Sequence, residues 1–391
     1  MTSHSTAKPT IALVGLGFGA EFAPIYRDHP DVGALVLCDA DPDVLNRVGD
    51  QFGIEERYST LEDVLAQDHI DAVHLVTALP EHGTQSIAVL SANKHCASTV
   101  PMAIDFDQMA EIVRLEEATG KNYMMMETAV YTREFLHCQE LFNTGVFGPV
   151  TFAKGVHYQD MEGWPSYWNG LPPMWYMTHA ISPILRLLGT RTRSVRALGS
   201  GRLPQPRQAL YGNPYPAETA IFELDSPDIS IEVSRTLFQA ARAYTEAFSI
   251  YGQDYGFEWP QLEGEAPIHY VLHEAGVGRG RSIEALRIEA PDRADLLPPQ
   301  IAPYTRESVY SDGSHASFVQ GGGHNGSHPH LVHEFVRSIV EDRPARVDAL
   351  TAANWTAPGV AAHQSALNGG ERVEVPQFQR TCVAESDTRA S

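Results

Sequence analysis

A tyrosine and a histidine, Tyr176 and His179, stand three residues apart in a stretch from Trp175 to Leu188 whose apolar pattern predicts a helix. Residues three apart share one face of a helix, so both side chains are expected to point the same way. A neutral histidine accepts a proton near pH 7, and a tyrosine hydroxyl positions or relays it. We therefore predict that His179 is a general base assisted by Tyr176. The alternative is that His179 only packs in a helix interface.

A second group of proton-transferring side chains, His157-Tyr158-Gln159-Asp160, ends an expected strand. Side chains alternate between the two faces of a strand, so one of these residues is expected to face the same crevice as His179. We name His157 or Tyr158 as a candidate second base and Asp160 as a candidate substrate ligand. The alternative is a strand with one face in water.

Residues 321–330 contain four glycines and three histidines. This composition predicts a binding loop that leads into a helix, with Ser327 as its N-cap. His324 is a candidate for general-acid work or for binding substrate hydroxyls, and His328 is a candidate substrate ligand. No cysteine or carboxylate lies at a known ligand spacing from these histidines, so no metal is expected.

A glycine motif lies near the N-terminus, where Gly15-x-Gly17-x-x-Ala20 stands between an expected strand and an expected helix. In this context the glycines permit a tight turn and a close approach of a pyrophosphate to the helix N-terminus. Asp39 ends the next strand, 22 residues after Gly17, where a carboxylate binds ribose hydroxyls and repels a 2′-phosphate. The motif therefore predicts a site for NAD rather than NADP.

The remaining cofactor contacts are expected from the loops that follow the parallel strands, because these loops line the ligand crevice. Thr77 and His82 lie in one such loop, although capping of the next helix is an alternative role for it. The full set of expected cofactor-binding residues is Gly15, Gly17, Phe18, Gly19, Asp39, Thr77, His82, Thr99, Pro101 and Glu127.

The elements that must position these residues fall into two patterns. Up to about Thr128, apolar strands alternate with helices, which predicts βαβ units and a parallel sheet. Beyond it, strands at 150–156, 193–198, 219–224, 229–234 and 246–251 predict an antiparallel sheet. We expect an α/β fold with a Rossmann domain at 1–127 and an α+β substrate domain with a large, mostly antiparallel open sheet at 128–348. A C-terminal helix and tail at 349–391 is expected to pack back on the core.

Other segments are expected to be less regular. The proline-rich stretches 203–216 and 291–303 predict loops, and the tail from Gln377 is expected to be loosely ordered.

Composition limits the classes of partner. The formal charge of −21 over 391 residues argues against nucleic acid or anionic membranes, which require basic surface. The four cysteines show no CxxC spacing, and the N-terminus lacks a basic, signal-like segment. We expect a cytoplasmic protein whose partner is a small molecule.

The chain resembles the glucose–fructose oxidoreductase/inositol dehydrogenase (Gfo/Idh/MocA) family over nearly its whole length. The likeness is carried by the glycine motif with Asp39, Lys94-His95, Pro101-Met102-Ala103, Gly145-x-Phe147-Gly148 and the helix 335–344. The family implies oligomers, here a dimer or tetramer, formed through the C-terminal sheet. It commonly uses a lysine in a Glu-Lys-Pro motif, but Thr99-Val100-Pro101 stands there in this chain, and Trp175 occupies the position of the family's aspartate.

A narrower branch, the NAD-dependent glycoside hydrolases of family 109, also lacks the lysine and keeps a Tyr-x-x-His pair. The matching segments here are Met126-Glu127-x-x-Val130-Tyr131-x-Arg133-Glu134, Tyr176-x-Thr178-His179 and Gly323-His324-Asn325-Gly326. A long insertion that the branch carries before the Tyr-x-x-His segment is absent. Glycoside 3-oxidases are related as well.

The resemblance implies transient oxidation of a sugar at C3 by NAD, elimination and hydration across C1 and C2, and re-reduction. The first alternative is a net sugar 3-dehydrogenase, and the second is a non-catalytic NAD(H) sensor. The expected substrate-binding residues are Tyr131, Arg133, Asp160, Trp164, Trp175 and His328, with the aromatic stretch 164–168 stacking on a sugar or forming a core corner.

Overall fold

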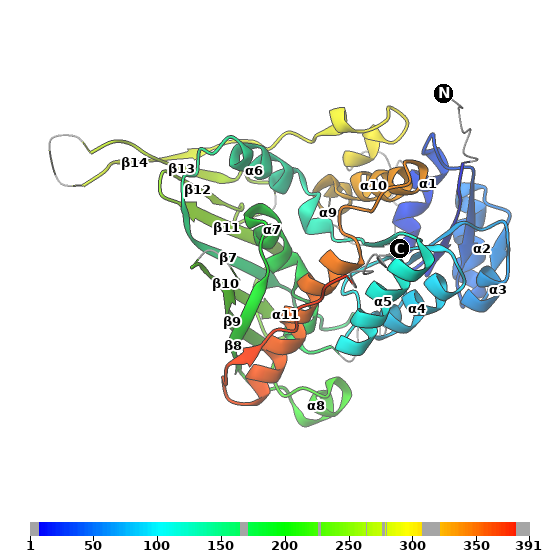
Figure 1. Ribbon diagram of the computed structural model, residues 1–391, viewed down its shortest axis with the longest axis horizontal. Coiled ribbons are helices and arrows are strands. Elements are labelled where there is room, and N and C mark those ends of the chain that lie inside the picture. The colour runs from blue at the N-terminus through cyan, green and yellow to red at the C-terminus, as the bar shows by residue number, and fades with distance from the viewer. Residues whose placement is uncertain are drawn as a thin grey trace, which may run out of the picture.

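The computed structural model describes residues 8–164, 171–225, 228–262, 264–275, 278, 280–306 and 321–380. Its two sheets lie at opposite ends of the molecule, with most of the helices between them or around the first sheet (Figure 1).

The first sheet is parallel and has six strands in the order β3-β2-β1-β4-β5-β6. Because the order reverses between β1 and β4, a crevice is expected at the carboxyl ends of these two strands. The strands are β1 (Thr10–Val14), β2 (Ala34–Cys38), β3 (Arg57–Tyr58), β4 (Ala72–Leu75), β5 (His95–Ser98) and β6 (Tyr123–Met125).

The helices of this domain begin and end at residues suited to those places. Asp41 accepts hydrogen bonds from the amides of Asp43 and Val44 at the start of α2, which ends at Gly53 in the left-handed conformation. Asp105 and Gly120 do the same for α5. The helical segments are η1 (Gly19–Phe22), α1 (Ala23–Asp28), α2 (Pro42–Phe52), α3 (Leu61–Leu65), η2 (Leu79–Glu81), α4 (His82–Ser91) and α5 (Phe106–Thr119).

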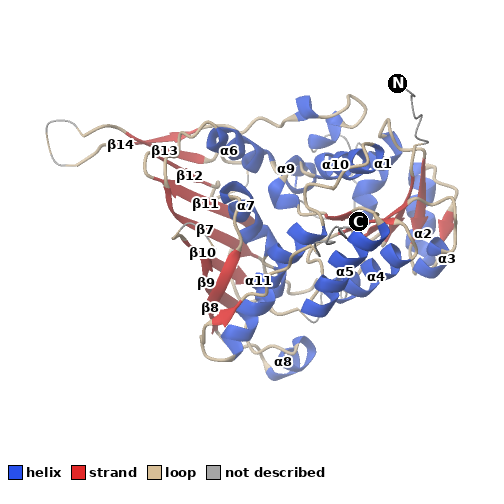
Figure 2. Cartoon of the chain, viewed as in Figure 1, coloured by secondary structure: helices blue, strands red, loops and turns tan. Residues whose placement is uncertain are grey.

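The second sheet has nine strands in the order β14-β13-β12-β11-β7-β10-β9-β8-β15, and it is antiparallel except between β7 and β10. The strands are β7 (Val150–Tyr158), β8 (Thr192–Ser200), β9 (Ala217–Leu224), β10 (Ser230–Thr236), β11 (Thr245–Gly252), β12 (Tyr255–Glu258), β13 (Ile268–Leu272), β14 (Ile283–Arg287) and β15 (Val373–Glu374). In Figure 2 the helices of this domain gather on the face of the sheet that looks toward the first domain.

The helix α7 crosses this inner face and carries His179. A side chain at Gly155 on β7 would lie 2.0 Å from the carbonyl oxygen of Ala180, so the glycine permits α7 to pack directly on the strand. The other helical segments are η3 (Thr128–Val130), α6 (Arg133–Asn143), η5 (Pro173–Tyr176), α7 (Thr178–Leu188), α8 (Gln205–Tyr211), η6 (Ala294–Leu296), η7 (Ala302–Thr305), α9 (Gly321–Gly326), α10 (His328–Val340) and α11 (Ala349–Leu367).

Several sequence predictions need correction. The stretch 203–216, predicted as a loop, contains α8, and the glycine-rich segment forms the short helix α9. Ser327 stands at the N-cap position of α10, but its side chain makes no capping hydrogen bond. The stretch 175–188 is not one helix, because Tyr176 closes the 3₁₀ turn η5 before α7 begins.

The described end of the chain is also anchored rather than loose. Arg380 donates to Glu116 at 3.1 Å and to Asp348 at 2.6 Å, and the amide of Phe378 donates to Asn354 at 3.3 Å. The rest of the tail, 381–391, lies outside the described residues. Within the described parts of the chain, no helix combines the length and apolarity that a bilayer crossing requires.

Candidate active site

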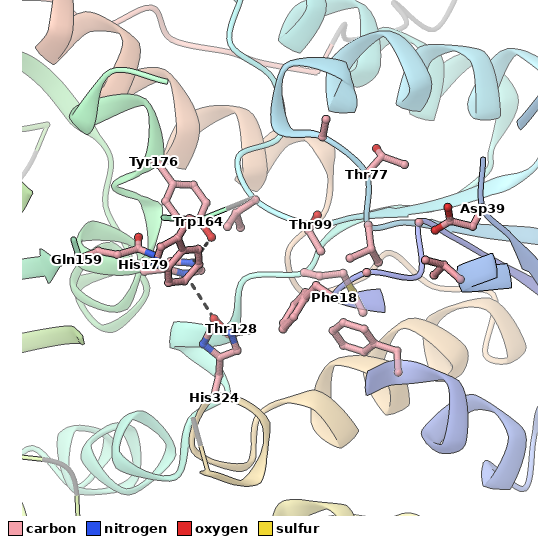
Figure 3. A pocket seen from close by; sticks show the side chains of 18 of the residues that line it. Phe18, Asp39, Thr77, Thr99, Thr128, Gln159, Trp164, Tyr176, His179 and His324 are labelled. Atoms are coloured by element: carbon pink, nitrogen blue, oxygen red, sulfur yellow. Dashed lines mark hydrogen bonds between the residues drawn. The ribbon is translucent and has the colours of Figure 1, made fainter. Parts of the chain in front are cut away.

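A cavity of about 330 Å³ lies where the carboxyl edge of the first sheet meets the inner face of the second (Figure 3). One end is lined by residues of the glycine motif and its neighbouring loops, namely Gly15, Gly17, Phe18, Asp39, Thr77 and Thr99. The other end is lined by Gln159, Trp164, Tyr176, His179, Tyr244 and His324. The cavity thus joins the predicted cofactor residues to the predicted acid–base residues.

The glycine end fits a dinucleotide. Gly15 has φ +88°, and a Cβ there would lie 2.3 Å from the carbonyl oxygen of Val76, so only glycine fits this turn. Asp39 accepts hydrogen bonds from the amides of Leu16 at 2.6 Å and Asp41 at 2.8 Å. These bonds fix its carboxylate at the end of β2, where it would meet the adenosine ribose.

Some of the other predicted cofactor residues line the cavity, and others hold the loops that line it. Thr77 and Thr99 line the cavity, whereas His82 is buried between the carbonyl oxygens of Pro101, at 2.9 Å, and Thr77, at 3.1 Å. Gly19 lies in η1 against Val76. His82 and Pro101 therefore support the loops that would hold NAD rather than lining the cavity themselves.

The position where a catalytic lysine would be expected is apolar. Val100 lines the cavity and is only 5% exposed, and Met126 lines it as well. Neither side chain can accept or donate a proton, so proton transfer must come from other side chains of the site.

A short acid–base contact beside the cavity joins His179 to Glu127. The Nδ1 of His179 lies 2.5 Å from the Glu127 carboxylate, which is completely buried, and 3.4 Å from the hydroxyl of Thr128. A carboxylate that accepts the Nδ1 proton leaves Nε2 as the proton-accepting atom. Nε2 lies 3.4 Å from the hydroxyl of Tyr176, so these two side chains meet although they lie on different helical segments. Glu127, a predicted cofactor contact, has its carboxylate against His179.

Two buried carboxylates determine the protonation of His179. Burial lowers its pKa, but the charges of Glu127 and Glu246 outweigh burial and leave the pKa above its ordinary value. His179 is therefore expected to be neutral, and able to accept a proton, only at pH values above the ordinary histidine pKa.

Glu246, which the sequence analysis did not single out, lies among three histidines. Its carboxylate is 3.4 Å from Nε2 of His179, 3.7 Å from Nε2 of His157 and 3.5 Å from Nδ1 of His324. It also accepts a hydrogen bond from the hydroxyl of Tyr244. Although burial raises the pKa of Glu246, the nearby histidines hold it well below its usual range.

Arg235 lies beneath this group and is completely buried. Its guanidinium donates to the carbonyl oxygens of Tyr176 at 3.0 Å and His157 at 3.3 Å, to the carbonyl of Thr236, and to the side chain of Gln159 at 2.7 Å. Burial lowers the pKa of Arg235 to about 10, so it stays charged near neutral pH. Its charge offsets those of the buried carboxylates.

Two other predicted catalytic residues, His157 and Tyr158, and the predicted substrate ligand Asp160 are not among the residues lining the cavity. His157 is completely buried behind Glu246, and Tyr158 points to the opposite face of the sheet, where it lines a separate hollow with Trp259. Asp160 is exposed and accepts a hydrogen bond from the amide of Glu162. Of the two candidates for a second base, His157 or Tyr158, alternation on β7 sends His157 inward toward Glu246 and Tyr158 outward.

Most of the predicted substrate ligands contact other protein side chains and do not line the cavity. Trp175 packs against His363 beside α11, and the Tyr131 ring is buried in the core. His328 lies 3.1 Å from the buried carboxylate of Glu21. Trp164 lines the cavity, whereas residues 165–168 of the same aromatic stretch lie outside the described residues.

Arg133 binds the backbone instead of the cavity. It donates to the carbonyl oxygens of Thr305 at 3.0 Å and Asn325 at 3.4 Å, which ties α6 to the turn that presents His324. In the described part of the chain, no three histidine, cysteine, aspartate or glutamate residues are grouped so as to hold a metal ion.

Residues 10–127 match the Gfo/Idh/MocA family model, described as an oxidoreductase family with an NAD-binding Rossmann fold. This N-terminal domain is therefore similar to the NAD-binding domain of that oxidoreductase family, and the match supports NAD as the cofactor of an enzyme.

Curated relatives extend the likeness to nearly the whole chain. "Glycosyl hydrolase family 109 protein 1" of Bacteroides thetaiotaomicron is 24% identical over 409 residues, which cover 95% of this chain and 84% of the relative. The family 109 protein of Shewanella pealeana is 23% identical over 410 residues, covering 95% and 85%. These matches confirm the resemblance seen in the sequence.

Solved structures confirm the fold. A levoglucosan dehydrogenase in complex with NADH and levoglucosan has a TM-score of 0.72 at 18% identity, covering 94% of this chain and 100% of that one. An oxidoreductase from Kribbella flavida has a TM-score of 0.74 at 17% identity, covering 95% and 100%. The Rossmann domain and the mostly antiparallel second sheet were therefore both correctly predicted.

Asp39 gives a test of the cofactor end. Replacing it with alanine is expected to raise the KM for NAD by about tenfold, because about 1.4 kcal/mol of ribose binding is lost. The same change should improve the ratio of NADP to NAD turnover, because the carboxylate no longer repels a 2′-phosphate. Steady-state kinetics with both nucleotides measure this, and an unchanged ratio would contradict the assignment.

Proposed function

We propose that this protein is an NAD-dependent glycoside hydrolase that oxidises a sugar at C3, cleaves the bond at C1 by elimination and hydration, and then re-reduces C3. The observation that carries the proposal is that more acid–base groups lie in the cavity lining or directly behind it than oxidation alone needs. His179 with Glu127 suffices to deprotonate one hydroxyl, yet Tyr244, Glu246 and His324 lie beside it. The names of the curated relatives support the same reaction class.

The first step requires a base at the C3 hydroxyl. His179 would accept the hydroxyl proton at Nε2 while Glu127 stabilises the resulting imidazolium through Nδ1. Tyr176, whose hydroxyl is 3.4 Å from Nε2, would orient the substrate hydroxyl. Bound NAD, held by Gly15, Gly17 and Asp39, would accept a hydride from C3 and return it at the end of the cycle.

The apolar residues of the cavity lining would keep water away from the oxidised sugar. Val100 and Met126 lie among the residues lining the cavity, on the side of the glycine motif. Apolar side chains there exclude water, so that the oxidised sugar would meet water only where the second acid–base group directs it.

The test is a panel of nitrophenyl glycosides incubated with the purified chain, with and without added NAD. Nitrophenol release that depends on NAD, without net accumulation of NADH, is the expected result. Stoichiometric NADH with an intact glycosidic bond would overturn the proposal in favour of a net sugar 3-dehydrogenase. Absence of any turnover, with a rise in melting temperature on adding NAD, would instead leave an NAD(H) sensor.

Arg133 gives a second test, because it was a candidate for binding an anionic sugar. If it only holds the turn that carries His324, Arg133→Ala should lower turnover about tenfold for neutral glycosides and glycosiduronates alike. A loss confined to glycosiduronates would contradict the structural role. Arg306→Ala, at an exposed ion pair with Asp292, is the matched control.

We also propose that the chain forms homo-oligomers through its nine-stranded sheet. Large apolar side chains, among them Phe152, Leu198 and Ile221, are 39–60% exposed on strands β7, β8 and β9. Sedimentation measurements test this proposal, and a monomer at all concentrations would contradict it.

A further inference from the structure

We propose that His324 and Glu246 form a second proton-transfer pair, in which His324 removes the C2 proton of the oxidised sugar and returns it after hydration. This inference rests on the proposed function and assigns the elimination step to particular residues.

The geometry of this pair repeats that of His179 and Glu127. The Nδ1 of His324 lies 3.5 Å from the Glu246 carboxylate, and its ring lines the cavity. If Nδ1 donates to the carboxylate, Nε2 becomes the atom that accepts a substrate proton. The ring centroids of His179 and His324 are 6.2 Å apart, so both side chains can reach neighbouring carbons of one sugar. Figure 3 shows the two residues near each other in the cavity lining.

Glu246 can stabilise a protonated His324 because it stays ionised, although only 8% of its side chain is exposed. Three histidines face its carboxylate from three different elements, and the hydroxyl of Tyr244 donates to it. A buried anion stabilises an imidazolium beside it, so it favours transfer of a proton to His324.

The other candidates for this step are less well placed. His157 is completely buried, and burial and the nearby Arg235 hold its pKa well below the ordinary value. Tyr158 lies on the opposite face of the sheet. His324 is therefore the remaining candidate histidine among the residues lining the cavity apart from His179.

The backbone around His324 is also fixed in an unusual form. His324 and Asn325 have φ values of +44° and +54°, a conformation that side chains other than glycine rarely adopt. The hydrogen bond from Arg133 to the carbonyl of Asn325 holds this turn. Such local strain is typical of residues positioned for a functional contact.

Protons and electrons are conserved in this elimination and hydration. His324 takes the C2 proton, and the C2–H electron pair forms the C1–C2 double bond and expels the aglycone oxygen, which takes a proton from water. The hydroxide formed from that water then adds to C1, and His324, whose proton has exchanged with solvent, donates a proton to C2. The net change at C1 is exchange of the aglycone for hydroxyl, with the C3 carbonyl unchanged.

The test separates oxidation from elimination. In D₂O with NAD and a nitrophenyl glycoside that the wild type cleaves, three quantities are followed: NADH formed in a single turnover, deuterium incorporated at C2, and nitrophenol released. For His324→Gln we expect NADH formation within about threefold of wild type, and C2 exchange and nitrophenol release lowered about 100-fold. His273→Gln, the same change at a half-exposed site near the β13–β14 hairpin, is the matched control.

Each outcome decides the matter. Wild-type C2 exchange in His324→Gln would overturn this inference and leave the proposed function standing. An equal loss of NADH formation and exchange would place His324 in the oxidation step and also overturn it. No C2 exchange in the wild type itself would overturn the proposed function, and this inference with it.

Glu246 is tested as a positioning residue. Glu246→Gln keeps the shape of the side chain but removes its charge, so it should lower the rate of C2 exchange about tenfold more than the rate of NADH formation, which Glu246 also influences through His179. A purely structural role would leave exchange unchanged, because the amide fills the same space, and that result would contradict the pairing.

Discussion

Replacing His179 with glutamine is expected to slow NADH formation from a glycoside by about 10²–10⁴-fold, the usual contribution of a general base. The dissociation constant for NAD should stay within about twofold of wild type, because His179 lies at the far end of the cavity from Asp39 and the glycine motif. Single-turnover absorbance measures the first quantity, and displacement of fluorescent NADH by NAD measures the second. Substantial residual oxidation would contradict the assignment of the base.

The pH dependence of this step follows from the two carboxylates beside His179. A base must be neutral to accept a proton, and Glu127 and Glu246 raise the pKa of His179 against the lowering effect of burial. The rate of NADH formation should therefore rise with pH and level off only above about 6.5, the ordinary histidine pKa.

Glu127→Gln tests directly whether this carboxylate sets the pKa of His179. The amide oxygen still accepts the Nδ1 proton at the same place, but the negative charge is lost, so the pKa of His179 falls. The rising limb of the profile should move to lower pH, and the plateau rate should drop about tenfold because the imidazolium is less stabilised. A profile unmoved by this change would show that Glu127 does not control the base.

Much of the fold was accessible from sequence because its signals are local. The strand–glycine–helix pattern at Gly15 and the carboxylate at Asp39 each belong to one βα unit, so their placement at the cavity was correctly predicted. The strands predicted at 150–156, 193–198 and 246–251 lie within β7, β8 and β11 of the structure. Strands β12 to β14 were missed, since each is short and lacks a strong alternation of apolar residues.

The site was only partly accessible because it depends on pairing between distant strands. Glu246 reaches the cavity region because β11 pairs with β7 in a register that sets Glu246 opposite His157. No local pattern marks that register. The link from Glu127 to His179 likewise joins residues 52 positions apart, so the sequence indicated both residues without indicating their contact.

The second large effect is expected on stability and comes from Arg235, a residue that no sequence motif marked. Arg235→Met should lower the free energy of unfolding by about 3–5 kcal/mol, the usual cost of removing one partner of a buried charged group. The methionine leaves the side chain of Gln159 and the backbone oxygens of Tyr176 and His157 without their donor. It also removes the cation that offsets Glu246. Urea unfolding followed by circular dichroism measures the change.

The choice of variants makes this result specific to the buried guanidinium. Arg235→Lys keeps a charge but offers a single donor group in place of a planar fork, so its stability should lie between wild type and Arg235→Met. Arg114→Met, on the exposed face of α5, is the matched control and should leave unfolding nearly unchanged. If Arg235→Met were as stable as wild type, the buried guanidinium would not be needed to support the site. The position of Tyr176, whose carbonyl it holds, would then need another explanation.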